Sequence, residues 1–194
     1  SMDLVANMLV SELRAGSRAD ALDVEMLRPT LGRESHMVKA SPSAERPVDR
    51  FLHRFWDYSM WLRSKARAFD VFHIVDHSYA HLAHVLPAHR TIVTCHDVDA
   101  FLPLVDPALA TSRLPTVFTR LIRSGMRKAA RVTCDSHATR EDVCQYNLVP
   151  PDKLVVVHNG THVSFSPRAS FASDHNIDRM LNGRAGDTIE LLHV

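Results

Sequence analysis

The segment FDVFHIVDHSY, residues 69–79, shows the pattern that decides the fold: an apolar run at 71–75 ends abruptly in polar residues. The pattern returns in TIVTCHDV at 91–98, in ARVTCDSHATREDV at 130–143 and in KLVVVHNG at 153–160. Short apolar runs of this kind are typical of strands buried in a parallel sheet. Helical stretches separate them, so we predict an α/β fold with a Rossmann-like, doubly wound parallel sheet covered on both faces.

The remaining segments are interpreted by their apolar periodicity. Apolar residues that recur at helical spacing predict four helices, at 4–13, 48–68, 114–126 and 137–146. Residues 22–26 alternate between apolar and polar side chains, which predicts a half-buried strand. The segment from Pro29 to Pro47 is rich in Ser, Pro and charge and is expected to be a long loop.

Composition excludes several classes of protein. The 194 residues, 45% of them hydrophobic, suffice for one sizeable core and exclude wholesale disorder. Lys and Arg (23) nearly balance Asp and Glu (22), so no overall field indicates a nucleic-acid partner. We find neither an apolar run of membrane-spanning length nor a signal-peptide pattern, and the three cysteines are expected to be buried thiols in a reducing compartment. These features predict a cytoplasmic protein.

Polar side chains follow each of the four predicted strands. In open parallel sheets, ligands bind beyond the carboxyl ends of the strands, so these residues are expected to converge on one pocket. Each of them also has a purely structural interpretation: Asp135 or Ser136 is equally suited to capping the next helix, and Gly160 to a turn with positive φ. The residues at the four strand ends are Asp76, His77, Ser78, Tyr79, His96, Asp97, Asp135, Ser136, His158, Asn159 and Gly160.

The order and spacing of the four segments resemble those of the retaining, nucleotide-sugar-dependent glycosyltransferases of the GT-B fold, in glycosyltransferase family 4. The segment IELLHV at 189–194 resembles the opening strand of that family's second domain. On this resemblance, residues 1–172 are expected to form the Rossmann-like N-terminal half of a GT-B fold, apparently without its first strand. Residues 173–194 are expected to form a linker and the first strand of a truncated second domain.

The resemblance implies transfer of a sugar from a nucleotide-diphosphate donor to a glycan or lipid-linked hydroxyl acceptor, without a cofactor or metal. It places His96 against the donor sugar as the catalytic residue, with Asp97 beside it as a substrate-binding residue. His77 and Tyr79 fall on the acceptor side of the cleft. Ser136 and the Asn159–Gly160 turn match further family positions and are predicted to bind substrate, although Thr161 and His162 replace the Val and Asp that usually follow this turn. The groups that bind the nucleotide belong to the family's second domain.

Two other classes of function fit parts of the sequence. One is a non-catalytic binding or scaffold domain, because half of a GT-B enzyme lacks a complete cleft. The other is a metal-binding module built on His73, His77, His81 and His84, whose spacing of four, four and three suits one helix face. The β-branched run around His73 favours a strand there, which separates His73 from the other three and makes the metal interpretation the weaker one.

The segment 113–131 is strongly basic and contains no acidic residue. One interpretation is a core-facing helix with a solvated basic surface. The other is a surface that contacts anionic lipid at the inner face of a membrane, as peripheral enzymes with lipid-linked acceptors do. The basic residues are Arg113, Arg120, Arg123, Arg127, Lys128 and Arg131.

Overall fold

The computed structural model describes residues 2–16, 22–28, 53–106, 108 and 113–160. The chain separates into two units, Ser1–Asn159 and Gly160–Val194, and every helix and strand described belongs to the first. The predicted loop at 29–47, the start of the predicted helix at 48–68, the boundary at 172 and the strand at 189–194 lie outside the described residues.

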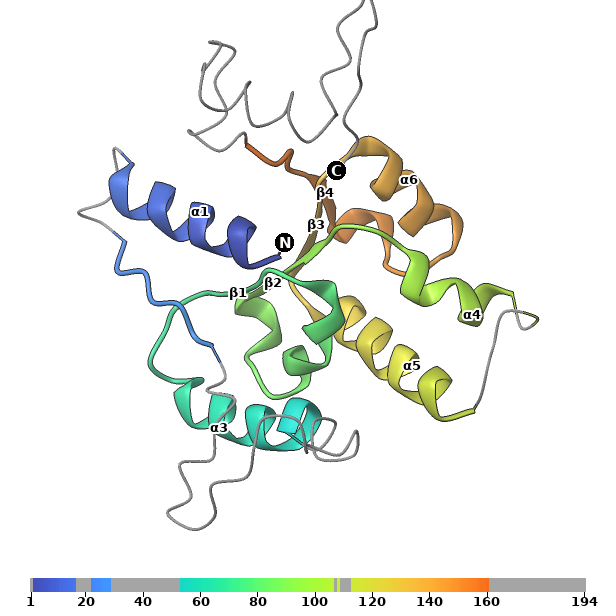
Figure 1. Cartoon of the computed structure of the whole chain (residues 1–194), viewed down its shortest axis with the longest axis horizontal. Helices are drawn as coiled ribbons and strands as arrows, with labels where there is room; N and C mark the ends of the chain where they lie inside the picture. The colour runs from blue at the N-terminus through green and yellow to red at the C-terminus, as the bar shows by residue number, and fades with distance from the viewer. Residues whose placement is uncertain (1, 17–21, 29–52, 107, 109–112, 161–194) are drawn as a thin grey trace, which may run out of the picture. The chain divides into compact units, whose positions relative to one another are not determined.

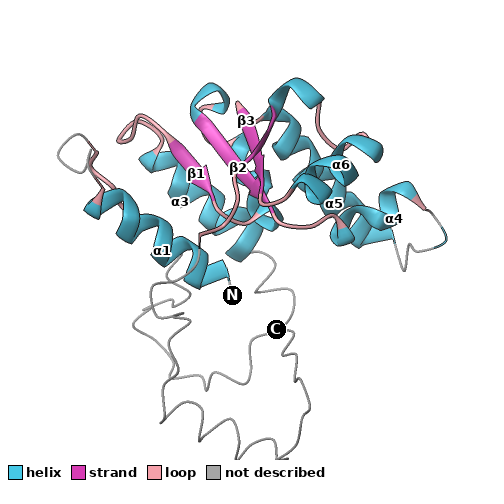
Figure 2. Cartoon of the chain, turned by 90° about the horizontal axis from the view of Figure 1, so that it is seen from above, coloured by secondary structure: helices cyan, strands magenta, loops and turns pink. Residues whose placement is uncertain are grey.

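Four parallel strands form the centre of the first unit. They are β1 (Phe72–Ile74), β2 (Thr91–Cys95), β3 (Arg131–Cys134) and β4 (Leu154–Val156). They pair in the order β1-β2-β3-β4, of which Figure 2 shows the first three side by side, and each coincides with an apolar run of the sequence. This parallel sheet with flanking helices confirms the predicted α/β, Rossmann-like fold.

Helices precede the sheet and connect its strands (Figure 1). Three of the predicted helices are found close to their expected positions, as α1, α5 and α6. The predicted helix at 48–68 is, in its described part, a π-helical turn followed by a short α-helix that ends at Lys65. The elements are α1 (Met2–Ala15), η3 (His53–Asp57), α3 (Tyr58–Lys65), η4 (His77–His84), η5 (Ala88–Arg90), η6 (Asp99–Phe101), α4 (Leu102–Val105), α5 (Arg113–Lys128), α6 (His137–Gln145) and η8 (Pro151–Lys153).

The predicted strand at 22–26 is wrong, because residues 22–28 pair with no strand. Leu22 is exposed, and the Val24 carbonyl accepts a hydrogen bond from the Arg14 guanidinium (Nη2···O 2.6 Å) instead of a ladder bond. The Arg28 guanidinium donates to the Asn7 side chain of α1 (2.9 Å). The alternating pattern correctly predicted that Val24 is partly buried. It does not reveal whether a neighbouring strand is present to pair with the segment.

The two faces of the sheet differ in chemistry. One face buries Val93 and Val132 completely, together with other apolar side chains of the strands. Each strand pairs with the next strand of the chain, and right-handed crossovers between such strands place the connecting helices on one face of the sheet. In agreement, η4 contacts β1 and β2, and α6 contacts β3 and β4. The other face carries a hydrogen-bonded row in which Thr94 Oγ1 lies 2.7 Å from His73 Nε2 and 2.8 Å from Thr133 Oγ1. Within the described part of the chain, the crossovers therefore cover the apolar face.

The helix α5 packs closely against η4 and also makes hydrogen bonds to the turn after α6. Its Gly125 lies directly against the backbone of η4, where an added Cβ would overlap the Ala80 carbonyl. Two of its arginines reach the turn after α6: the Asn147 carbonyl accepts from Arg123 (2.8 Å) and from Arg127 (3.1 Å). Asn147 has φ 48°, a left-handed conformation that asparagine tolerates after a helix end.

Candidate functional site

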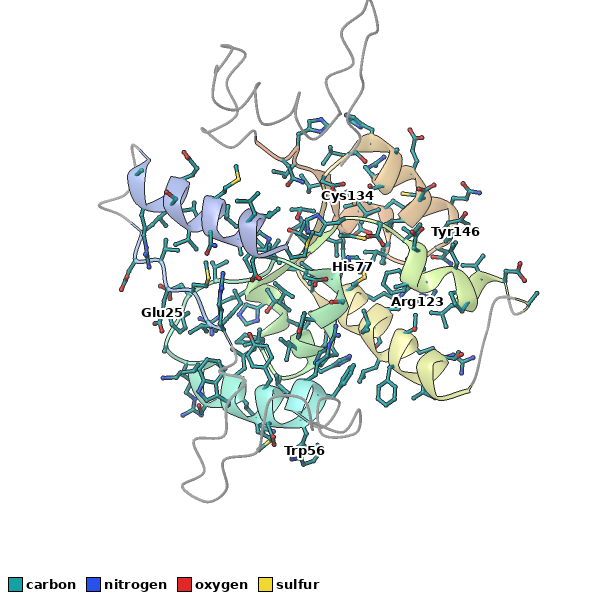
Figure 3. The ribbon with its side chains drawn as sticks, in the orientation of Figure 1. Glu25, Trp56, His77, Arg123, Cys134 and Tyr146 are labelled. Atoms are coloured by element: carbon teal, nitrogen blue, oxygen red, sulfur yellow. The ribbon has the colours of Figure 1, made fainter. Side chains whose placement is uncertain are left out.

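The carboxyl ends of the strands carry a compact polar cluster, which we call the strand-end cluster: His77, His96, Asp97, Asp135 and Thr139. Asp76 ends the segment after β1 and accepts a hydrogen bond from the Ser78 amide (2.8 Å), which starts η4. His77 is the first residue of η4 after this cap, and its side chain is buried, with 8% exposed. Figure 3 shows His77 near the middle of the ribbon and Trp56 at its outer edge.

His96 follows β2 and has both ring nitrogens engaged. Its Nε2 lies 2.8 Å from the Val75 carbonyl oxygen, and its Nδ1 lies 3.2 Å from Asp135 Oδ2. The side chain of His96 is only 9% exposed, whereas that of Asp135 is 21% exposed. The ring thus joins the ends of three adjacent strands.

His77 packs beside His96 and close to a second carboxylate. The ring centroids of His77 and His96 are 6.5 Å apart, and His77 Nε2 is 3.8 Å from Asp97 Oδ1. Burial lowers the pKa of His77, while the charges of Asp97 and Asp76 act in the opposite direction. The Asp97 side chain is 58% exposed, so its carboxylate is the solvent-accessible member of this pair.

Ser136 and Thr139 connect the cluster to the start of α6. Ser136 Oγ accepts a hydrogen bond from the Thr139 amide (3.0 Å), which confirms the interpretation of Ser136 as a helix cap. The Thr139 hydroxyl lies 3.1 Å from Asp135 Oδ1 and 3.2 Å from the His96 carbonyl oxygen. The predicted substrate contact of Ser136 therefore competes with a structural role of the same hydroxyl.

The other predicted site residues lie at the margins of the cluster. The Tyr79 ring has the Arg54 guanidinium 4.1 Å from its centroid and Tyr58 at its edge, so its contacts lie on the side of η3 and α3. Asn159 and Gly160 follow β4 and are exposed. Among the described residues, an added Cβ at Gly160 meets no atom within 4 Å, and the φ of Gly160 is not left-handed, so neither feature demands glycine there.

The histidines considered as metal ligands contact separate partners. His73 pairs with Thr94, His81 stacks on Phe55 (4.3 Å between centroids) and His84 pairs with Ser124 (2.8 Å). Among the described residues, no group of three or more His, Cys, Asp and Glu side chains is arranged to hold a metal ion. In this part of the chain, the histidines act as packing and hydrogen-bonding groups.

Sequence reasoning missed the roles of Asp135, Thr139 and Arg54. Asp135 was predicted to lie at the pocket edge or to cap the next helix, but its pairing with a histidine 39 positions earlier was not foreseen. The signal that reveals the pair is the strand register, because Cys95 pairs with Cys134 and the next residues are His96 and Asp135. Arg54 carries no comparable signal, because its contact with Tyr79 depends on how η3 packs against η4.

Burial of His81 makes stability depend on pH. Burial lowers the pKa of His81 to about 4, below the value of about 6.5 that an unfolded chain gives. The unfolded state then binds more protons, so stability that is present above pH 6.5 is lost as the pH falls toward 4. We expect urea unfolding to show a loss of about 2 kcal/mol between pH 7 and pH 5 from this group. The variant His81→Gln should flatten this dependence, and an unchanged slope in the variant would assign the effect to other groups.

The fold and the cluster together define a class: an α/β domain whose polar groups gather at the carboxyl edge of a parallel sheet, where such domains bind their ligands. The model of the family described as Glycosyltransferase Family 4 matches residues 6–165, which includes every strand of the sheet. The chain therefore belongs to glycosyltransferase family 4. No curated protein and no solved structure shows a significant match to it. None of the described helices is both long and apolar enough to cross a membrane.

Proposed function

We propose that this domain is the acceptor-side half of a retaining GT-B glycosyltransferase, which moves a sugar from a nucleotide-diphosphate sugar to a hydroxyl acceptor. The observation that carries the proposal is the strand-end cluster in a family 4 domain. His77, His96, Asp97 and Asp135 come from three different strand ends, yet each lies within 4 Å of another member. Polar groups are costly to bury unless they are paired, so the gathering of paired His and Asp side chains around the exposed Asp97 supports a binding role for this edge of the sheet.

The residues of the cluster suit distinct parts of the transfer. The reaction breaks the bond between the anomeric carbon and the diphosphate oxygen and forms a bond from that carbon to the acceptor oxygen, while the proton of the acceptor hydroxyl leaves with the diphosphate. The exposed Asp97 carboxylate accepts hydrogen bonds from sugar hydroxyls, and the histidine behind it, His77, limits its movement. His96 lies next to this carboxylate in the chain and orients the donor sugar. The departing diphosphate gains negative charge, which positive groups and helix N-termini stabilise.

A nucleotide-sugar panel tests the proposal. The intact enzyme, in which this domain is joined to its donor-binding half, is incubated with UDP-, GDP- or ADP-sugars and saccharide or lipid-linked hydroxyl acceptors, and the anomeric configuration of the product is determined by NMR. We expect transfer with retention for one donor class. Consumption of donor without glycosylation of any acceptor, or an inverted product, would contradict the proposal. Binding is measured in parallel, because acceptor saccharides should shift the NMR signals of His77 first, and the donor sugar those of His96 and Asp97.

We further propose that the domain works in the cytoplasm and contacts the inner face of the membrane through its basic surface. The structure divides the basic residues into two groups. Arg123 and Arg127 bind the Asn147 carbonyl and are held by the fold. Arg120, Lys128 and Arg131 are exposed, with the Lys128 ammonium at 3.5 Å from the His84 carbonyl oxygen, and we infer that these three side chains face the anionic lipid. Each contributes roughly 1 kcal/mol near an anionic bilayer.

Vesicle sedimentation tests this contact. We expect the protein to bind vesicles with anionic lipid at low salt and to be released at high salt, because the attraction is electrostatic. The triple variant Arg120→Gln, Lys128→Gln, Arg131→Gln should lose most of the binding. The control Arg63→Gln removes an exposed basic residue from α3 and should lose little. Equal binding to neutral and anionic vesicles would contradict the contact.

A further inference from the structure

The His96 ring is placed between two hydrogen-bond acceptors. Its Nε2 faces the Val75 carbonyl at 2.8 Å, and its Nδ1 faces an Asp135 carboxylate oxygen at 3.2 Å. A carbonyl oxygen and an ionised carboxylate accept hydrogen bonds but donate none. A neutral imidazole donates from one nitrogen only, so it leaves a lone pair directed at one of the two oxygens. Both contacts are satisfied together when the ring carries a proton on each nitrogen.

The Asp135 carboxylate is itself held in place. The Thr139 hydroxyl lies 3.1 Å from Asp135 Oδ1, which leaves Oδ2 directed at His96. Thr139 is buried and its amide is fixed by the cap from Ser136. The hydroxyl of Thr139 also lies 3.2 Å from the His96 carbonyl oxygen, so one side chain is in contact with both residues of the pair. Charge-assisted hydrogen bonds of this type are stronger than neutral ones and orient their partners.

The neighbouring histidines and carboxylates do not compete with Asp135 for the His96 ring. Burial lowers the pKa values of His73 and His77, so these two neighbours are neutral near pH 7 and do not repel a charged His96. Asp97 lies 3.8 Å from His77, and Asp76 is bonded to the Ser78 amide. In the described part of the chain, Asp135 is the carboxylate that contacts the His96 ring directly.

We propose that Asp135 is a positioning residue, which keeps the His96 ring doubly protonated and fixed in one orientation at the carboxyl end of β2. A role of this pair in catalysis rests on the proposed function. There, a fixed cation at this edge of the sheet attracts the anionic diphosphate of a nucleotide-sugar donor. Asp135 acts through His96 and needs no contact with the substrate. The proposal itself concerns a state of the free protein, so it is tested without any donor or acceptor.

Imidazole ¹⁵N NMR on the free protein near pH 7 reports the protonation of each ring nitrogen. In the wild type we expect both His96 nitrogens to resonate as protonated nitrogens. In Asp135→Asn, which keeps the size of the side chain and removes its charge, we expect Nδ1 to move to the range of an unprotonated nitrogen while Nε2 keeps its proton. The matched control is Asp97→Asn, which removes the neighbouring carboxylate that pairs with His77. This control should leave both His96 signals in the protonated range.

The wild-type spectrum decides the proposal even where a variant fails to fold. A wild-type His96 with one unprotonated nitrogen near pH 7 overturns it. Identical His96 spectra in wild type and Asp135→Asn, with an unchanged backbone amide spectrum, overturn it as well. Absence of sugar transfer in the donor panel would count against the proposed function and leave this result unaffected, so the two failures are distinguishable.

Discussion

Alanine at position 125 is expected to destabilise the folded chain by about 3 kcal/mol, the upper part of the usual range for overpacking. Gly125 lies where α5 meets η4, and an added Cβ would overlap the Ala80 carbonyl and approach the His81 amide nitrogen. Both neighbours are backbone atoms, so no side-chain rotation relieves the overlap. Helix propensity works in the opposite direction, because alanine is favoured over glycine by about 1 kcal/mol inside a helix. A net loss therefore isolates the steric contact.

Urea unfolding of Gly125→Ala and of Gly160→Ala provides the comparison. No atom of the described residues lies within 4 Å of an added Cβ at Gly160, so the second variant should be as stable as the wild type. A gain in stability for Gly125→Ala would mean that α5 and η4 move apart at little cost. Because η4 carries His77 and Tyr79, the same variant should also disturb the strand-end cluster, which the NMR signals of His77 would report.

The strands were predictable because each is a short apolar run that begins and ends at polar residues. β1 lies inside the apolar run at 71–75, and β2, β3 and β4 lie within the segments 91–98, 130–143 and 153–160 that showed the same pattern. The strand predicted at 22–26 was wrong because side-chain burial is only part of what makes a strand. A strand needs a partner for its backbone groups, and the sequence pattern reports side-chain burial without reporting whether a partner exists.

The site was predictable in position but not in its internal contacts. A parallel sheet brings its carboxyl ends to one edge, which was enough to place His77, His96 and Asp97 together. The His96–Asp135 pair depends on the register of β2 against β3, which fixes which strand-end residues are neighbours. The contacts of Tyr79 with Arg54 depend on how a π-helical turn packs, and no periodicity in the sequence reports that packing.

The second large effect expected is on catalysis: on the proposed function, His96→Ala in the intact enzyme should lower sugar transfer by about 100-fold, which is typical of removing one electrostatic contact to a transition state. The structure shows that the ring also bonds to Val75 and Asp135, so its removal leaves two acceptors without a partner. Stability should fall by about 1 to 3 kcal/mol as a result. A loss of this size still leaves a stable domain folded at room temperature, so the activity of the folded fraction remains measurable.

Two measurements on the same samples separate the catalytic role of His96 from its role in packing. Transfer is assayed well below the melting temperature of the variant, with the folded fraction known from urea unfolding. The control His84→Ala removes an exposed histidine of η4 that pairs with Ser124, and it should leave transfer unchanged. If His96→Ala transfers sugar at the wild-type rate per folded molecule while its melting temperature falls, then His96 only holds the strand ends together. The positive charge proposed for its ring would then have no part in the reaction, and the exposed Asp97 would become the residue of the cluster to test next.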